Sequence, residues 1–261
     1  MGASIAFHLA SLGARDVVLA DRRGIAAGAT SKAMGGVRQQ FSTAAEVRLA
    51  QASIRFFEEL GSPLFEQVGY LFLATTEAGL AELEERRELQ AELAATHGVE
   101  LPIRPLCRQL LETSELGLPD DLPMVLEAET GFHFRRRGDR LVLAMTDPEP
   151  RWGFEELVDE SLIPDRFERL QHRYGPAAET TIERSWAGLY DMTPDAHPIL
   201  GKVADGVYAA CGFSGHGFMQ SPAVGRALAE EILGETPGLD LSPYRLERFE
   251  SGASFPEELV L

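Results

Sequence analysis

A glycine-rich turn between an apolar run and a helical stretch is the feature that most constrains the fold of this chain. Residues 207–211 form a short apolar run typical of buried strands, and the turn 212–217 follows directly. Ser221 is a predicted N-cap, Pro222 would take the first helical position, and Gly234 marks the predicted end of the helix. This order predicts an α/β unit. Because glycine lets the backbone approach a ligand closely, the turn is a candidate binding loop; a plain strand–helix connection is the alternative.

The N-terminus has the second half of a dinucleotide-binding unit. Gly2 opens a predicted helix over 3–12, the apolar run 17–20 predicts a buried strand of a parallel sheet, and Asp21 follows nineteen residues after Gly2. In a complete unit a strand precedes G-x-G-x-x-G, the helix N-terminus binds the pyrophosphate, and the acidic residue binds the ribose. Only the last glycine is present, so we expect the first strand to lie before Met1. An ordinary helix–strand pair is the alternative.

The middle of the chain has a different texture from its two ends. We expect a loop over 24–36, a strand over 70–74 and helices over 43–60, 77–96 and 164–174. Short β-prone runs separated by turn residues predict an antiparallel sheet, and they lie at 124–126, 132–134 and 141–143. The sequence therefore predicts α/β elements at both ends with a β-rich insertion between them.

Charge and cysteine usage exclude several kinds of partner. A formal net charge of −17 disfavours nucleic acid and anionic membrane surfaces, because like charges repel. No apolar stretch is long enough to span a bilayer, so we expect no membrane span. Cys107 and Cys211 form no CxxC pair and the histidines show no ligand spacing. These features predict two free thiols, no metal site and a cytoplasmic location.

Four motifs belong to one pattern. They are Gly-Ala-Thr-Ser at 28–31, Gly-Gly-Val-Arg-Gln-Gln-Phe at 35–41, the stretch 186–201, and Gly-Phe-Ser-Gly-His-Gly-Phe-Met-Gln-Ser-Pro at 212–222. In this combination the chain resembles the FAD-dependent oxidoreductases of the D-amino-acid oxidase and sarcosine oxidase type. That family includes sarcosine oxidase, dimethylglycine oxidase, glycine oxidase and the catalytic subunit of dye-linked proline dehydrogenase. The resemblance runs from Gly2 to about Leu233.

The resemblance implies an α/β fold with an added antiparallel sheet. A Rossmann-like FAD-binding domain, incomplete here, would consist of residues 1–65 and 193–245, and an antiparallel-sheet substrate domain of residues 66–192. The family has a long segment before the strand that matches 105–110, and we find no counterpart for it in this chain. We therefore expect the parallel sheet to lack central strands, unless it closes by another route, a partner fills it, or the chain is a fragment.

A non-covalently bound FAD is implied by the same motifs. The implied cofactor-binding residues are Gly2, Asp21, Arg22, Ala29, Thr30, Ser31, Gly35, Gly36, Gly212, Ser214, Gly215, His216, Gly217, Phe218 and Met219. The N-terminal helix would face the pyrophosphate, and the turn 212–219 would wrap the isoalloxazine ring. The positive end of the following helix would stabilise the anionic reduced ring. Some relatives attach FAD through a cysteine at the position of Gly188, so we expect no covalent link there.

Three residues match the part of the family pattern that borders the substrate and are the candidate catalytic residues. Arg38 could hold a substrate carboxylate in a bidentate pair, with a structural salt bridge as the alternative. Tyr190 matches an aromatic residue of the amino-acid pocket, with a core tyrosine as the alternative. His216 lies beside the flavin in the resemblance, where it could bond the ring or support the loop. Some relatives have a lysine in place of Met219, so Arg38 would bind the carboxylate alone or the substrate would differ.

The implied activity is oxidation of the C–N bond of a small secondary or N-methylated amino acid, such as sarcosine or proline, by hydride transfer to the flavin. The alternative is a non-catalytic shortened paralogue, a subunit, or a fragment of such an enzyme. A nicotinamide-binding Rossmann enzyme is disfavoured, because the turn 212–219 has no role in one. A partner subunit, a homo-oligomer, and oxygen or an electron-transfer protein as oxidant all stay open.

Overall fold

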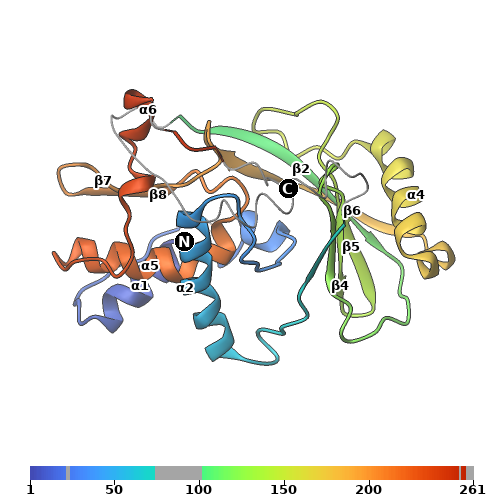
Figure 1. The fold of residues 1–261 in the computed structure, drawn as a ribbon, viewed down its shortest axis with the longest axis horizontal. Coiled ribbons are helices and arrows are strands. Elements are labelled where there is room, and N and C mark those ends of the chain that lie inside the picture. The colour runs from blue at the N-terminus through green and yellow to red at the C-terminus, as the bar shows by residue number, and fades with distance from the viewer. Residues whose placement is uncertain (22–23, 74–101, 253, 257–261) are drawn as a thin grey trace.

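A six-stranded sheet and a group of three packed helices form the two halves of the molecule (Figure 1). The structure, a computed structural model, describes residues 1–21, 24–73, 102–252 and 254–256. The fold is mixed α/β, as the sequence predicts, with a second, two-stranded sheet beside the helices. The predicted helix over 77–96 and residues 22–23 lie outside the described residues.

The large sheet is mixed rather than antiparallel throughout. Its strands are β1 (Tyr70–Leu73), β2 (Arg104–Thr113), β3 (Met124–Glu127), β4 (His133–Arg137), β5 (Arg140–Ala144) and β6 (Ile182–Met192), in the order β1-β3-β4-β5-β2-β6. Strand β1 pairs with β3 in parallel, with Tyr70 opposite Met124, and all other pairs are antiparallel. The runs 124–126, 132–134 and 141–143 pair antiparallel, as predicted, and the edge strand β1 is the parallel exception. Parallel neighbours need a long connection, and the fifty residues between β1 and β3 are long enough to provide one.

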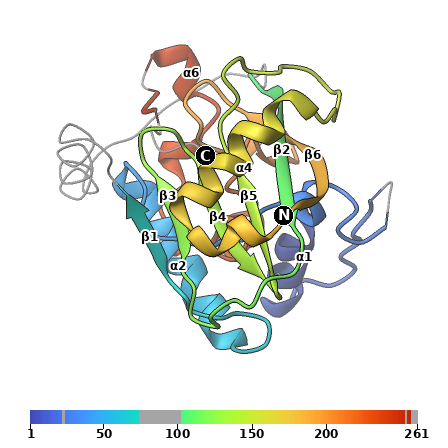
Figure 2. The same ribbon diagram turned by 90° about the vertical axis from the view of Figure 1, so that its right-hand side faces the viewer.

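Helix α4 (Ile163–Arg173) covers the outer face of the large sheet (Figure 2). The apolar side chains beneath it form one buried cluster: Leu111, Val125, Phe132, Phe134, Leu141, Leu143, Leu170 and Ala177. The buried carboxylate of Glu127 fastens the helix to β3, because it binds Arg169 at 3.0 Å and also Arg173. Short 3-10 helices flank α4 at Glu160–Leu162 (η2) and Gly175–Glu179 (η3). The sheet therefore leaves only its other face for the rest of the chain.

On that other side the helices α1 (Gly2–Ser11), α2 (Ala44–Leu60) and α5 (Gly217–Ile232) pack together beside β7 (Ile199–Ala204) and β8 (Val207–Cys211). Thr43 caps α2 by accepting a hydrogen bond from the backbone N–H of Glu46 at 3.3 Å, which confirms the predicted start of this helix. Gly225 faces Ser4, and a side chain there would overlap it, so α1 and α5 lie close together. The remaining short helices are η1 (Ala29–Lys32), η4 (Ser242–Tyr244) and α6 (Arg248–Ser251).

The segment 17–20 does not form the predicted buried strand. It belongs to no ladder, and Val18 and Leu19 are 87% and 57% exposed. A strand is stable only beside a neighbour, and no strand of the described residues lies next to this one. The strand β8 departs from prediction in a similar way: it pairs antiparallel with β7 and its side chains are only half-buried. The parallel sheet expected of the N-terminal domain is therefore absent from the described residues.

Helix α5 begins one turn earlier than the sequence predicts. Its N-cap is His216, so Pro222 lies inside the helix and cannot donate to the carbonyl of Phe218. The hydroxyl of Ser221 donates to that carbonyl instead, at 2.9 Å. Ser221 thus replaces the bond that proline removes rather than capping the helix. Gly234 follows the last turn with φ +78°, as predicted for a helix end.

Among the described helices, none combines the length and the apolar character needed to cross a membrane.

Candidate functional site

A cavity of about 160 Å³ lies between the loop before α2, the inner face of the large sheet, and the turn before α5. Twelve of the sequence-predicted residues line it: Ala29, Thr30, Gly35, Gly36, Arg38, Tyr190, Ser214, Gly215, His216, Gly217, Phe218 and Met219. These residues come from positions nearly two hundred residues apart in the chain. The two glycine-bearing loops therefore face one space.

The other predicted residues lie away from this cavity. Gly2 begins α1, and Asp21 is exposed just after the segment 17–20. Ser31 uses its hydroxyl locally, donating to the carbonyl of Gly28 at 3.2 Å, and Gly212 lies one step behind the lining. Arg22 lies outside the described residues.

The turn before α5 needs glycine at two positions. Gly212 has φ +72° and donates its N–H to the carboxylate of Asp191 at 2.7 Å. Gly215 has φ +96° and lies against the ring of Tyr190, where an added Cβ would come 2.5 Å from a ring carbon. The hydroxyl of Ser214 accepts from the backbone N–H of Thr193 at 3.2 Å. These contacts hold the turn tightly against the end of β6.

The N-terminus of α5 opens onto the cavity with unused backbone donors. Gly217, Phe218 and Met219 all line the cavity, and within the described residues their N–H groups have no acceptor. The first intrahelical bond of this helix runs from the N–H of Gln220 to the carbonyl of His216, at 3.2 Å. Such a helix N-terminus stabilises a negatively charged group that lies close to its free N–H groups.

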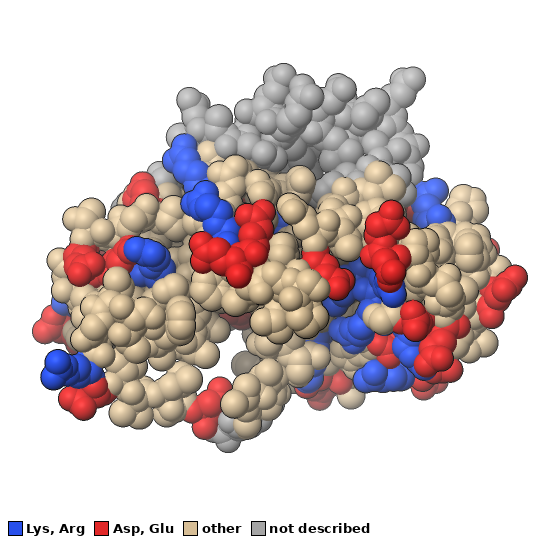
Figure 3. Space-filling view, turned by 90° about the horizontal axis from the view of Figure 1, so that it is seen from below, with Lys and Arg blue, Asp and Glu red and all other residues tan. Residues whose placement is uncertain are grey.

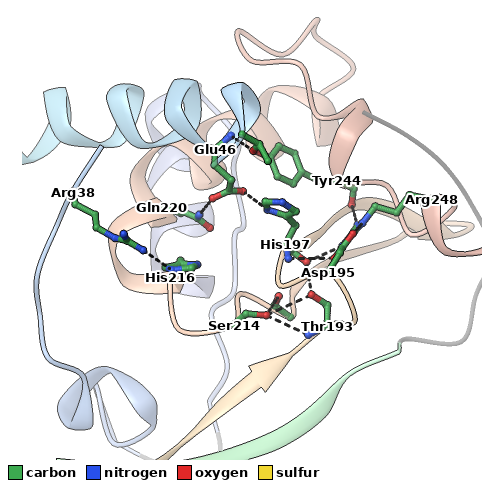
Figure 4. Close-up of polar contacts among 12 residues, drawn as sticks. Arg38, Glu46, Thr193, Asp195, His197, Ser214, His216, Gln220, Tyr244 and Arg248 are labelled. Carbon is green, nitrogen blue, oxygen red and sulfur yellow. Dashed lines mark hydrogen bonds and ion pairs between the residues drawn. The ribbon is translucent and has the colours of Figure 1, made fainter. Parts of the chain in front are cut away.

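Arg38 and His216 meet on the wall of the cavity (Figure 4). Arg38 is buried, and its Nη2 donates to Nε2 of His216 at 3.4 Å. The guanidinium also lies 4.6 Å from the centre of the Phe41 ring. Burial, and then the positive charge of Arg38, hold the pKa of His216 well below its usual range. His216 is therefore neutral, and because Arg38 can only donate, its ring proton is on Nδ1.

Behind this wall a buried polar network joins α2, α5 and the loop after β6 (Figure 4). The carboxylate of Glu46 accepts from the side chain of Gln220, and its other oxygen lies 3.1 Å from Nδ1 of His197. Asp195 binds Arg248 through both oxygens, at 2.7 and 2.9 Å, and all four of the charged or ring side chains are buried. The network fixes the elements that carry the cavity wall.

Several polar side chains that were not predicted as site residues also line the cavity, and three of them stand on strands of the large sheet and have shifted pKa values. These three are Tyr70, Arg108 and His133, on β1, β2 and β4. Burial lowers the pKa of His133 to about 4 and raises the pKa of Tyr70 to about 12. Arg108 is 9% exposed, and burial lowers its pKa too. A signal for Arg108 was present, since it is a charged residue inside the apolar run 106–111 of a strand.

A wider groove of about 880 Å³ adjoins the cavity and shares Gly35, Gly36, Arg38, Tyr70, Met124 and Phe218 with it. Its other lining includes the consecutive arginines 135–137 of β4, and basic side chains gather on the face seen in Figure 3. Arg136 is paired with Asp120, and Arg137 lies 3.4 Å from the carboxylate of Glu112. Arg135 donates to the carbonyl of Met34, which fastens the first glycine loop to the sheet.

The residues present fit the ring end of an FAD molecule. The glycine loops allow close approach, the α5 N-terminus suits a negatively charged ring edge, and the cavity wall is cationic. The first loop is held in place, since Trp186 donates to the carbonyl of Lys32 at 3.2 Å. At the adenosine end the described residues supply the N-terminus of α1 and the exposed Asp21, without a neighbouring strand.

Comparisons with known proteins agree with this arrangement. The profile of the family described as DAO, FAD dependent oxidoreductase, matches residues 1–101 and 89–231. FAD-dependent oxidoreductase domain-containing protein 1 from Bos taurus is 37% identical over 176 residues, which are 63% of this chain and 36% of that protein. Sarcosine oxidase subunit beta from an Arthrobacter species is 37% identical over 163 residues, 61% of this chain and 40% of that protein. The chain thus spans well under half the length of these curated relatives.

Among solved structures, L-proline dehydrogenase from P. horikoshii superposes with a TM-score of 0.87 at 20% identity, covering 97% of this chain and 96% of that one. The similarity at this level of identity concerns the fold. Together with the family profile, which matches most of the sequence, it answers the question of ancestry. The chain belongs to the FAD-dependent oxidoreductase family that contains the D-amino-acid and sarcosine oxidases.

Proposed function

We propose that this chain forms the flavin- and substrate-binding part of an enzyme that oxidises the C–N bond of a small secondary or N-methylated amino acid. The observation that carries the proposal is the single cavity onto which both glycine loops, the α5 N-terminus and the buried Arg38–His216 pair open.

The relatives support the choice of substrate class. One is named as a subunit of sarcosine oxidase, and the fold matches an L-proline dehydrogenase. Bound FAD would supply the acceptor for hydride from the carbon next to the amine. In this proposal residues 1–65 and 193–245 form the FAD-binding domain and residues 66–192 the substrate domain. No cysteine stands at Gly188, which supports a non-covalent cofactor.

The side chains of the cavity would bind and orient the substrate. The cationic wall, to which Arg38 and Arg108 belong, favours an anionic group such as a carboxylate. The ring of Tyr190 forms an apolar side of the cavity, and burial raises the pKa of its hydroxyl, so the hydroxyl stays protonated and able to donate. Neutral His216 accepts from Arg38 and keeps the guanidinium in place.

The test is anaerobic reduction of the FAD-loaded chain by sarcosine and by L-proline, followed by flavin absorbance. We expect bleaching of the oxidised flavin band by at least one of these amino acids and none by methylamine. A loaded chain whose flavin stays oxidised with both amino acids would contradict the proposed activity.

A second candidate is a non-catalytic shortened paralogue or subunit. The exposed apolar segment 17–20 favours it, because Val18 and Leu19 lie where a family member would have a covered strand. The two candidates differ in cofactor uptake. A purified chain that is colourless and binds no added FAD would support this second candidate.

A further inference from the structure

The inner face of the large sheet carries two polar side chains that the proposed chemistry leaves unused, Arg108 and His133. Cross-strand register places them on one face. His133 lies opposite Ala144, which lies opposite Leu110 on the next strand, and Arg108 is two residues from Leu110. Directly paired residues and residues two apart point to the same face of a sheet. All of these residues line the cavity.

Arg108 is a buried guanidinium without a counter-ion. Within the described residues it has no hydrogen-bond or ion-pair partner. The central carbon of its guanidinium lies 5.7 Å from the centre of the Tyr190 ring. Asp147, whose charge reaches it, already binds Arg151 and Arg166. An unpaired buried charge is costly, so the site suits a ligand that brings a negative charge.

Arg108 lines the cavity next to the β6 strand. Gly188 lies directly opposite it in the β2–β6 pair, and the side chain of Lys32 packs against Gly188. Arg38, in contrast, already contacts Nε2 of His216 and the ring of Phe41. Arg108 is therefore better placed than Arg38 to take a carboxylate in a bidentate pair.

His133 offers the complementary group, a hydrogen-bond acceptor. Its Nδ1 lies 2.7 Å from the carbonyl of Gly131, and because a carbonyl only accepts, Nδ1 carries the proton. The other nitrogen, Nε2, is then an acceptor, and no described residue donates to it. His133 is 4% exposed, and burial keeps it neutral.

We propose that Arg108 binds the carboxylate and His133 Nε2 accepts a hydrogen bond from the amine of one amino-acid molecule in the cavity. The two residues stand on strands separated by β5 alone and are offset by two residues along them, so their backbones are about 12 Å apart, and both line the cavity. The two residues would together recognise the carboxylate and the amine of the substrate, so both would determine specificity. The proposal rests on the proposed function, because it concerns the substrate of the same cavity.

Calorimetry with three probes separates the two roles. L-Proline has both groups, cyclopentanecarboxylate lacks the amine, and pyrrolidine lacks the carboxylate. The wild-type chain, measured with and without FAD, is expected to bind L-proline most tightly. We expect Arg108→Gln to weaken the binding of L-proline and cyclopentanecarboxylate by roughly 10- to 100-fold and to leave the binding of pyrrolidine unchanged. Arg108→Lys should recover part of this loss.

For His133→Phe we expect the affinities for L-proline and pyrrolidine to fall about tenfold and the affinity for cyclopentanecarboxylate to stay unchanged. Arg136→Gln is the matched control, because Arg136 is on the same strand as His133 and is paired with Asp120. It should leave the affinities for all three probes unchanged. Near-UV circular dichroism checks that each variant is folded. If Arg108→Gln is not folded, the affinities of Arg108→Lys test the role of Arg108.

The proposal is overturned if the wild-type chain binds none of the probes, or if the Arg108 variants weaken pyrrolidine as much as cyclopentanecarboxylate. Failure of the proposed function looks different. A chain that binds the probes with this selectivity but takes up no FAD would leave the recognition intact and remove the oxidoreductase activity. If L-proline reduces the flavin equally well in the wild type and in Arg108→Gln, the oxidoreductase activity stands and the role of Arg108 in recognition is removed.

Discussion

The turn before α5 and the segment after α1 carry the two parts of one expected cofactor site, yet they differ in how they are supported. Gly215 in the turn is pressed against Tyr190, and a buried network lies behind it. Gly13, after α1, has nearly the same backbone angle, φ +93°, with no atom within 4 Å of an added Cβ. The ring end of the site is thus enclosed by buried tertiary contacts, whereas at the adenosine end α1 packs on α5 but the segment after α1 is exposed.

Breaking the network behind the turn should have the largest effect on stability. Arg248 is fully buried and binds Asp195 and the carbonyl of His197, so Arg248→Ala leaves a buried carboxylate without its partner. We expect a loss of about 3–5 kcal/mol in the free energy of unfolding, measured by urea denaturation. Lys202→Ala, which removes an exposed partner of Asp205, is the control and should cost less than about 1 kcal/mol. Equal losses of stability in Arg248→Ala and Lys202→Ala would contradict a stabilising role for the buried network.

Acid should act on the cavity side more than on the α1 side. The folded pKa of His133 is about 4, below its ordinary 6.5, so the unfolded chain takes up a proton first as the pH falls. Its contribution is present above pH 6.5 and is lost as the pH falls toward 4, by roughly 3 kcal/mol in all. His133→Phe should flatten this part of the stability–pH curve. His8→Gln, on the more exposed α1, should change it less, since solvent screens that site.

The two glycines test the same contrast by a matched substitution. Gly13→Ala costs only the strain of a left-handed alanine, about 1–2 kcal/mol. Gly215→Ala adds an overlap with the Tyr190 ring, and we expect it to cost a further 1–3 kcal/mol or so and to weaken FAD uptake. Thermal unfolding and a flavin titration on both variants measure the difference. Similar values for the two would show that the turn has room to relax.

The smallest effect on stability is expected in the exposed segment 17–20. Val18 is 87% exposed, so Val18→Ser should change the free energy of unfolding by less than about 0.5 kcal/mol. Val224 in α5 is fully buried, and Val224→Ala should cost about 2 kcal/mol. A large loss for Val18→Ser would mean that the segment is covered in the protein in solution.

Local signals were sufficient where a single element decides its own structure. The start of α2 near Thr43 and the end of α5 at Gly234 could be predicted directly, because helix ends depend on a few neighbouring groups. The start of α5 could not. Ser221 and Pro222 have the chemistry of a helix start, but the turn packed against Tyr190 begins the helix earlier, and the serine hydroxyl replaces the missing bond.

Pairing between distant strands was beyond the sequence for a different reason. The run 17–20 has the composition of a buried strand, and composition does not say whether a neighbour is present. The family motifs did lead to one cavity, since most of their residues line it. Arg108 stands out locally as a charged residue in a strand, but its position on the same face as His133 depends on register across three strands, which no local pattern records.

The central claim is that the cavity between the two glycine loops binds FAD without a covalent link. The most direct measurement is a titration of the purified chain with FAD, followed by flavin fluorescence and by filtration to separate bound from free cofactor. We predict saturable uptake of one FAD per chain, with the flavin released intact on denaturation. A chain that stays colourless through the titration, or flavin that remains attached after denaturation, would contradict it.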